Sequence, residues 1–416
     1  LLSHLSLTRG PKDPAGIMYF SQTLTLAVSI VSLASAGSPA VSPRQAQQSL
    51  SDALSKHADL SAFNQLLSSY PSIIDNVTAG AENKITLLVP TNDALANFLK
   101  QSNASDMSQL PVDQVLTVFK YHTMDAPLTA MNFSSPKGIT VPTKLRDELY
   151  NLRSPGPALI SQYGDEAQGQ VLYVSRDTIN PAKLRVRQGS SSDDNTANLR
   201  AGLGQTAELT AIDGEWDGGY FQSIDTVLEA PRPCSTTIKK LSSSLTSLMD
   251  ALEKTKLWRT LDAKANVTCL GPNTEAFNEA GSPEKALGNE DLKNALLFHT
   301  LPQVAYSNFL EDGQVFTSLA NVTVRVTIKD DEIWFNDAKV VSPNVLTNNG
   351  LIHVLDRVMS PNATGPSSSD SPSSTASPTG STGPSSTNAP PSAGNPITGN
   401  IRAAAVIALA AGVLLI

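Results

Sequence analysis

The sequence of 416 residues is poor in cysteine, which occurs only at Cys234 and Cys269. Two cysteines exclude a disulfide-rich scaffold, and without a CxxC pair or a nearby pair of histidines they do not form a typical zinc site. A bridge between them would close a loop of about 36 residues and stabilise the fold by about 3–4 kcal/mol in the chain-entropy description. We predict this disulfide, with two free buried thiols as the alternative.

Positive charge is also scarce. The chain has 30 Lys and Arg residues against 38 Asp and Glu residues, which gives a net charge of −8. Its densest basic stretches are Lys239-Lys240 and the alternating Arg185 and Arg187. Nucleic-acid binding needs a basic stripe or patch, so this charge pattern excludes it. An acidic surface favours solubility instead.

The familiar catalytic patterns are missing from the sequence. It has no Gly-x-Ser-x-Gly, no His-Glu-x-x-His and no phosphate loop. The run GLGQTA (202–207) resembles a dinucleotide-binding loop, but it is flanked by polar loop sequence rather than by a strand and a helix. The run DGEWDG (213–218) has calcium-loop carboxylates, but Ile224 stands where a bidentate Glu is needed. We therefore predict a protein that is not an enzyme and has no cofactor and no metal.

An interrupted apolar run follows Met18, and Ala34-Ser35-Ala36 supplies the small-x-small pattern that a signal peptidase needs. The run is too short for a stable membrane span. We interpret residues 18–36 as a signal peptide and residues 1–17 as upstream gene-model sequence.

A low-complexity segment follows the central part of the chain. Residues 361–400 contain 30 Ser, Thr, Pro or Gly residues, and Asp370 is their one charge. Such a segment buries too little apolar surface to offset its ordering entropy, and its composition suits O-glycosylation. We predict a disordered, glycosylated stalk.

The sequence ends in a hydrophobic tail, residues 403–416. As a helix it would measure about 21 Å, which is short of the roughly 30 Å hydrocarbon core. Small residues around Ser392, an eight-residue spacer and this tail are typical of a glycosylphosphatidylinositol (GPI) signal. Ser392 is the predicted attachment residue, with Gly394 and Asn388 as alternatives.

Secretion brings N-glycosylation with it, and six asparagines stand in N-x-S/T patterns. The predicted acceptors are Asn76, Asn103, Asn132, Asn266, Asn321 and Asn362.

The central part of the chain contains a repeated motif. TLLVPTNDAL (Thr86–Leu95) and TCLGPNTEAF (Thr268–Phe277) both pass from an apolar run through proline to a polar group. Proline donates no hydrogen bond, so it ends a strand ladder, and the polar group that follows can cap a helix. The motif therefore predicts a strand-to-helix joint built twice.

The predicted elements keep the same order around both joints. The first copy is expected to hold a helix at 50–76, a strand at 85–89 and a helix at 112–124. The second is expected to hold a helix at 241–257, a strand at 267–270, a helix at 291–301 and strands at 315–319, 321–328, 332–341 and 349–359. The first copy is about 46 residues longer, and we place the excess in surface loops near 150–172 and 188–215.

These motifs, in this order, resemble the fasciclin family of secreted or surface adhesion modules. The family has a second conserved motif, box two, with the sequence Asn-Gly-x-Ile-His-x-Ile-Asp-x-Val-Leu. Residues Asn349–Met359 resemble it closely, whereas residues 220–228 keep the end of box two but have lost its Asn-Gly and its histidine. The residues that match family motifs are Pro90, Thr91, Asn92, Asp93, Tyr121, His122, Asp225, Pro272, Asn273, His299, Asn349, Gly350, His353 and Asp356.

The resemblance implies an α+β fold with two tandem fasciclin-like domains at 45–231 and 234–360. Each would be a twisted β wedge flanked by short helices, and the disordered stalk would follow them. It also implies a non-catalytic adhesion or cell-wall glycoprotein, GPI-anchored on the extracellular face of the plasma membrane. The combination of signal peptide, Ser/Thr-rich stalk and lipid anchor is typical of fungal surface proteins. The protein's partners would be cell-surface or cell-wall glycans or proteins, or a second copy of the chain. The alternative function is a module that binds a lipid or another small apolar ligand.

We expect most of these motif residues to be structural. His122 and His299 stand on apolar faces, where a satisfied core histidine is more common than a ligand. Asp225 and Asp356 are expected to accept hydrogen bonds from the joints. Asn92 and Asp93 have a recognition patch as their alternative role.

Overall fold

The computed structural model describes residues 48–78, 84–176, 197–363 and 365–366. Residues 1–17, the predicted signal peptide, Ser392 and the tail at 403–416 lie outside these ranges, as does most of the predicted stalk. Within the described ranges, no helix is both long enough and apolar enough to cross a membrane.

The first copy begins with helices and then builds a sheet. Its helices are α1 (Leu50–Leu54), α2 (Ser61–Ser69), α3 (Pro71–Thr78), α4 (Asn92–Gln101), α5 (Val112–His122) and α6 (Pro157–Tyr163). Its strands are β1 (Ile85–Pro90), β2 (Thr123–Met124), β3 (Ile139–Pro142), β4 (Val171–Ser175), β5 (Ala197–Arg200), β6 (Thr206–Trp216) and β7 (Gly219–Ile224).

The second copy repeats this plan. Its helices are α7 (Cys234–Lys240), α8 (Ser242–Thr255), α9 (Trp258–Ala263), α10 (Thr274–Glu279), α11 (Pro283–Ala286) and α12 (Asn289–Phe298). Its strands are β8 (Val267–Pro272), β9 (Thr300–Leu301), β10 (Val315–Thr317), β11 (Thr323–Lys329), β12 (Glu332–Phe335), β13 (Ala338–Thr347) and β14 (Gly350–Leu355).

The two sheets have the same strand order. The first runs β2-β1-β7-β6-β5-β4-β3, and the second, read from its other end, runs β9-β8-β14-β13-β12-β11-β10. In each sheet the first strand pairs in parallel with the last, β1 with β7 and β8 with β14. The other paired strands are antiparallel. The predicted α+β fold with two tandem domains is therefore confirmed.

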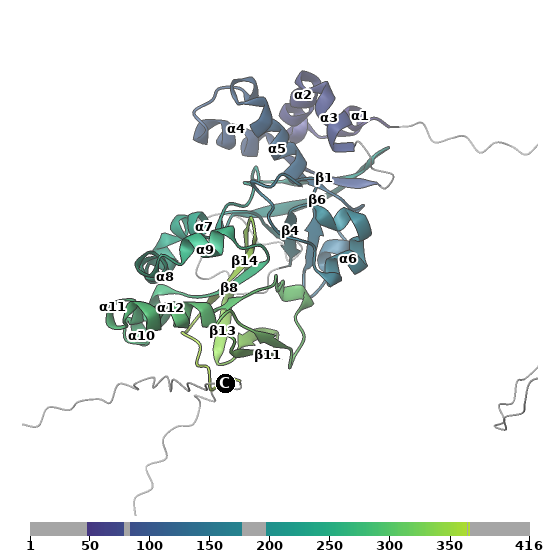
Figure 1. Cartoon of the computed structure of the whole chain (residues 1–416). Coiled ribbons are helices and arrows are strands. Elements are labelled where there is room, and N and C mark those ends of the chain that lie inside the picture. The colour runs from purple at the N-terminus through teal and green to yellow at the C-terminus, as the bar shows by residue number, and fades with distance from the viewer. Residues whose placement is uncertain (1–47, 79–83, 177–196, 364, 367–416) are drawn as a thin grey trace, which may run out of the picture. The chain divides into compact units, whose positions relative to one another are not determined.

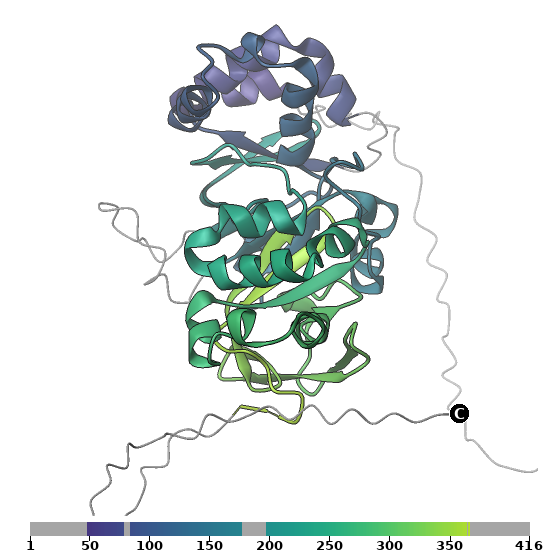
Figure 2. The ribbon, with the colours of Figure 1, turned by 60° about the vertical axis from the view of Figure 1, so that its left-hand side comes forward.

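Each sheet is buried on both faces near its centre. Side chains alternate along a strand, so Leu87 of β1 packs with the helical core while Leu88 packs with the other core cluster. In the second copy Cys269 and Leu270 divide in the same way. The helices α1 to α5 lie together over β1, and α8, α10 and α12 lie together beside β8 and β14 (Figures 1 and 2). Fully burying a leucine stabilises a fold by about 2 kcal/mol.

The expected loop insertions are wrong in part. The segment near 150–172 contains α6 and the start of β4, because apolar side chains such as Leu159 and Ala167 are buried against Tyr306 and Leu346 of the second copy. The segment near 188–215 contains β5 and most of β6, which fill the sheet positions of β12 and β13. Residues 177–196, between them, lie outside the described ranges.

Candidate functional site

The two joints have the geometry that their sequences predict. Pro90 and Pro272 are the last residues of β1 and β8. Thr91 is extended and its side chain accepts a hydrogen bond from the Ala94 N–H at 3.3 Å, so it caps α4. Asn273 caps α10 in the same way at 2.7 Å. A cap of this kind stabilises a helix by about 1 kcal/mol.

Asn92 connects the first joint to the preceding helix. Its Oδ1 accepts from the Ala62 N–H at 2.8 Å, and its Nδ2 donates to the Ala58 carbonyl at 3.1 Å. The amide of Asn92 is thereby engaged inside the domain. Asp93 is exposed in the first turn of α4, where a negative charge suits the helix dipole.

In each copy a threonine that was not predicted from the sequence holds the first strand, β1 or β8, to the segment that follows β2 or β9. The hydroxyl of Thr86 is fully buried, donates to the Ala126 carbonyl at 2.8 Å and accepts from the Leu128 N–H at 2.6 Å. Thr268 makes the same two kinds of bond at 2.8 and 2.9 Å. Both threonines stand four residues before the proline, which is the signal that could have identified them.

The two helix-end histidines are buried and bonded at both ring nitrogens. Nδ1 of His122 lies 2.6 Å from the Val118 carbonyl, and its Nε2 accepts from the Leu228 N–H at 3.0 Å. Since Nε2 accepts, Nδ1 carries the proton. His299 has the same arrangement at 2.8 and 2.9 Å. Burial lowers the pKa of each imidazole from 6.5 to about 4, so both are neutral clasps between a helix end and the segment after the last strand.

His353 of β14 is a third buried histidine, with the opposite tautomer. Its Nε2 lies 2.8 Å from the Ala305 carbonyl, and its Nδ1 accepts from the Asn344 N–H at 3.4 Å. Burial lowers its pKa to about 4 as well. Gln222 takes this place in the first copy and bonds to Asp213 of β6.

The carboxylates at the ends of the last strands bond to a different partner from the expected one. Asp225 accepts from the Glu208 N–H at 2.8 Å, and Asp356 accepts from the Lys339 N–H at 2.9 Å. Each aspartate therefore ties the last strand to the strand before it. The joint is held to β7 through the backbone instead, because the Thr91 N–H donates to the carbonyl at the end of that strand at 3.0 Å.

The glycine of box two is present in both copies, which corrects its expected loss from the first. Gly219 pairs with the start of β1 as Gly350 pairs with the start of β8. Both have positive φ, +137° and +155°, and a Cβ on either would lie about 2 Å from a carbonyl oxygen of the neighbouring strand. Asn349, fully buried, donates 2.7 Å bonds to the Leu261 and Lys264 carbonyls.

The aromatic residues before the histidines are also core residues. Tyr121 is fully buried and its hydroxyl donates to the Val171 carbonyl at 3.2 Å. Burial raises the pKa of this phenol well above 10. Phe298 takes its place in the second copy and is buried without a polar bond to make.

Taken together, these side chains bond to backbone groups rather than to one another in a catalytic arrangement. No group of three His, Cys, Asp or Glu side chains able to hold a metal ion occurs among the residues that the structure describes. The histidines are neutral and occupied at both nitrogens, so neither presents a free base. The arrangement holds strands and helices in register.

The two cysteines are neighbours in the second copy. Cys234 of α7 and Cys269 of β8 are buried free thiols whose Sγ atoms lie 3.5 Å apart. The bond to Cys269 and burial raise the pKa of the Cys234 thiol. The disulfide stays a prediction.

The predicted glycan acceptors differ in exposure. Four of those that the structure describes are exposed: Asn103, Asn132, Asn321 and Asn362. Asn266 is half-buried and its Oδ1 accepts from the Ser154 N–H at 2.8 Å. The side chain of Asn76 lies outside the described part. Glycan occupancy at all six stays a prediction.

Comparison with known proteins finds sequence similarity to fasciclin-domain proteins. The family model described as the fasciclin domain matches residues 243–361. A fasciclin-like arabinogalactan protein of Arthroderma benhamiae is 24% identical over 324 residues, which cover 76% of this chain and 67% of that protein. Fasciclin-like arabinogalactan protein CTB11 of Cercospora beticola is 25% identical over 324 residues, with 76% and 78% coverage.

Among solved structures, a FAS1 domain pair from the insect cell adhesion molecule fasciclin I is similar at 17% identity. The match covers 73% of this chain and 98% of that chain, with a TM-score of 0.32. Residues 243–361 thus match the fasciclin domain, and about three quarters of the chain is similar to fungal fasciclin-like proteins.

Proposed function

We propose that this protein is a non-catalytic, GPI-anchored glycoprotein of the cell surface or cell wall, whose two fasciclin domains act in adhesion. The observation that carries the proposal is that the motif side chains Asn92, His122 and His299 make their hydrogen bonds to backbone groups of their own domain. The names of the two fungal relatives, fasciclin-like arabinogalactan proteins, support a surface glycoprotein. The sequons and the Ser/Thr/Pro-rich stalk support it too.

Treatment of intact cells with a phosphatidylinositol-specific phospholipase C is expected to release the protein into the medium. Among membrane attachments this phospholipase cuts only a GPI anchor, and no described helix is suited to span a bilayer. A variant that ends at Arg402 is the matched control, because without its hydrophobic tail it should appear in the medium untreated. Retention of the full-length protein on cells, while a known GPI-anchored marker is released, would contradict the anchor.

The alternative function, binding of a small apolar ligand, has one observation in its favour. A groove of about 400 Å³ is lined by apolar side chains of Pro155–Leu159 and of the segment after β9, including Val304 and Phe316. A long-chain fatty acid should then raise the melting temperature by several degrees, and Val304→Asp should abolish the rise. An unchanged melting temperature at saturating fatty acid would count against this alternative.

A further inference from the structure

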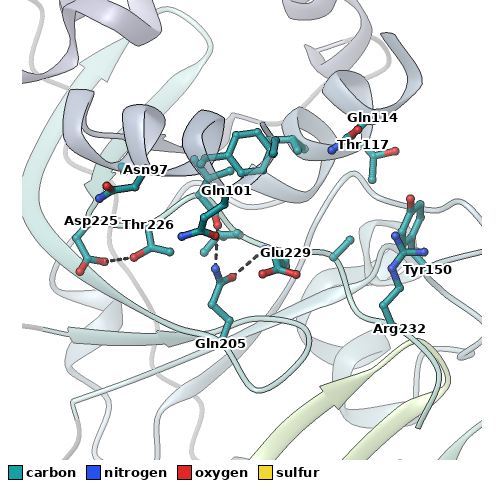
Figure 3. Close-up of a pocket in the computed structure, with 17 residues that line it drawn as sticks. Asn97, Gln101, Gln114, Thr117, Tyr150, Gln205, Asp225, Thr226, Glu229 and Arg232 are labelled. Atoms are coloured by element: carbon teal, nitrogen blue, oxygen red, sulfur yellow. Dashed lines mark hydrogen bonds between the residues drawn. The ribbon is translucent and has the colours of Figure 1, made fainter. Parts of the chain in front are cut away.

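A polar hollow lies in the first copy between α4, α5 and the segment that follows β7. Its volume is about 430 Å³, which is within the range of small-molecule sites. Asn97 and Gln101 extend from α4 toward Asp225, Gln205 and Glu229 on the opposite wall (Figure 3).

The walls of the hollow offer paired donors and acceptors. The amides of Asn97, Gln101 and Gln114 belong to exposed side chains, and each amide both donates and accepts. The Gln205 amide is fixed, because it donates to the Val227 carbonyl at 2.9 Å and accepts from the Glu229 N–H at 2.8 Å. Hydroxyl groups, which also donate and accept, are the natural complement of such a surface.

A second hollow of about 490 Å³ adjoins the first. Both are lined by Gln114, Thr117, Tyr150 and Arg232, so these residues form the boundary between them. The guanidinium of Arg232 lies over the Tyr150 ring at 4.9 Å, which gives the boundary a flat, amphipathic side. A linear ligand longer than one ring therefore has room to extend from one hollow into the next.

The charge of the two hollows selects against anions. Their lining contains four carboxylates and two cations, and the Lys120 ammonium is already paired with Asp147 at 3.1 Å. Asp225 already accepts from the Glu208 N–H and the Thr226 hydroxyl. A polyanion would meet an excess of negative charge, whereas a neutral polyhydroxylated chain would not.

We propose that these adjoining hollows bind a neutral oligosaccharide chain, a choice of ligand class that rests on the proposed location at the cell surface. The amides of Asn97, Gln101 and Gln114 and the Glu229 carboxylate hydrogen-bond its hydroxyls, and the ring of Tyr150 contacts its apolar face. This places one glycan-binding site on the first copy.

The second copy differs at the same positions and so offers a matched control. Counted from the helix cap, Glu279 stands where α4 has Asn97, and α10 ends there, before the position of Gln101. By strand register, Ser360 stands where the first copy has Glu229. Substitution of exposed Glu279 should therefore leave saccharide binding unchanged.

The test is calorimetric titration of the full secreted chain with laminarihexaose and with mannohexaose, and with hexagalacturonate as the acidic comparator. A neutral hexasaccharide should bind, and the double variant Gln101→Ala, Glu229→Gln should weaken binding at least about tenfold, because the first change removes the hydrogen bonds of an amide and the second replaces a charge-assisted bond with a neutral one. Glu279→Gln should bind like the parent. Melting temperatures of all three proteins should agree, because Gln101 and Glu279 are exposed and the Gln205 amide bonds only the backbone of Glu229.

Three results would overturn the site. They are no binding of either neutral hexasaccharide at millimolar concentration, equal binding by the double variant, and binding of hexagalacturonate alone. Lipase release of the protein from cells would still stand under any of them, so failure of the glycan site and failure of the surface anchor are separable.

Discussion

Gly350→Ala is expected to unfold the second copy. The residue has φ of +155°, and an added Cβ would lie 1.9 Å from the Val267 carbonyl oxygen of the parallel neighbour β8. That oxygen is backbone inside a buried sheet, so relief requires the parallel pairing of β8 and β14 to open. We expect a loss of more than about 4 kcal/mol in the free energy of unfolding. Urea unfolding followed by circular dichroism measures it.

Two further variants make this result specific. Gly219→Ala should have the same effect on the first copy, because its Cβ would lie 2.0 Å from the Ile85 carbonyl oxygen. Gly288→Ala, where the nearest atom is an Asp291 carboxylate oxygen at 3.8 Å, should cost at most about 1 kcal/mol. If Gly350→Ala were as mild as Gly288→Ala, the parallel pairing would not have the geometry described.

Acid is expected to destabilise the second copy more than the first. In the folded protein the pKa of His299 and of His353 is about 4, against 6.5 for an ordinary histidine. Between these two pH values the unfolded chain binds protons that the folded chain does not. The free energy of unfolding therefore has its full value above about pH 6.5 and falls as the pH drops toward 4. Each imidazole contributes about 3 kcal/mol to this loss. The first copy has one such buried histidine, His122, and has Gln222 at the position of His353.

The variant His353→Gln, which installs the residue of the first copy, isolates this effect. Its stability at pH 7 is expected to be lower, but its loss between pH 6.5 and pH 4.5 should be smaller than that of the parent by about the contribution of one histidine. Urea unfolding at a series of pH values measures both. An identical pH dependence in the two proteins would show that His353 is not buried in the neutral form.

The fold was predictable where local chemistry and the repeat agree. Pro90 and Pro272 end strands because they lack a donor, and a capping side chain follows each of them, so both joints could be placed from the sequence. The order of motifs around the joints then indicated two copies of one α+β plan. The identical strand orders of the two sheets bear this out.

The features that were not predicted are two strands in a loop-like composition and several bonds between segments distant in the chain. Strands β5 and β6 lie in a region rich in Gly, Asp and Asn, so the region resembled a loop, although β6 forms antiparallel hairpins with β5 and with β7. The register that aligns Gly219 with Gly350 depends on partners on another strand. Thr86 is an ordinary strand residue by sequence, and its role appears only when the chain beyond α5 returns to it. The polar hollow between α4, α5 and the segment after β7 likewise joins segments that are distant in the chain.

The central claim is that the motif residues hold the fold together, and the histidine tautomers test it most directly. The chain has five histidines, so their imidazole nitrogens can be assigned by NMR in a labelled sample. We predict that His122 and His299 carry the proton on Nδ1 and His353 on Nε2, and that all three stay neutral down to about pH 5. Imidazoles that titrate near pH 6.5, without a fixed tautomer, would contradict the claim.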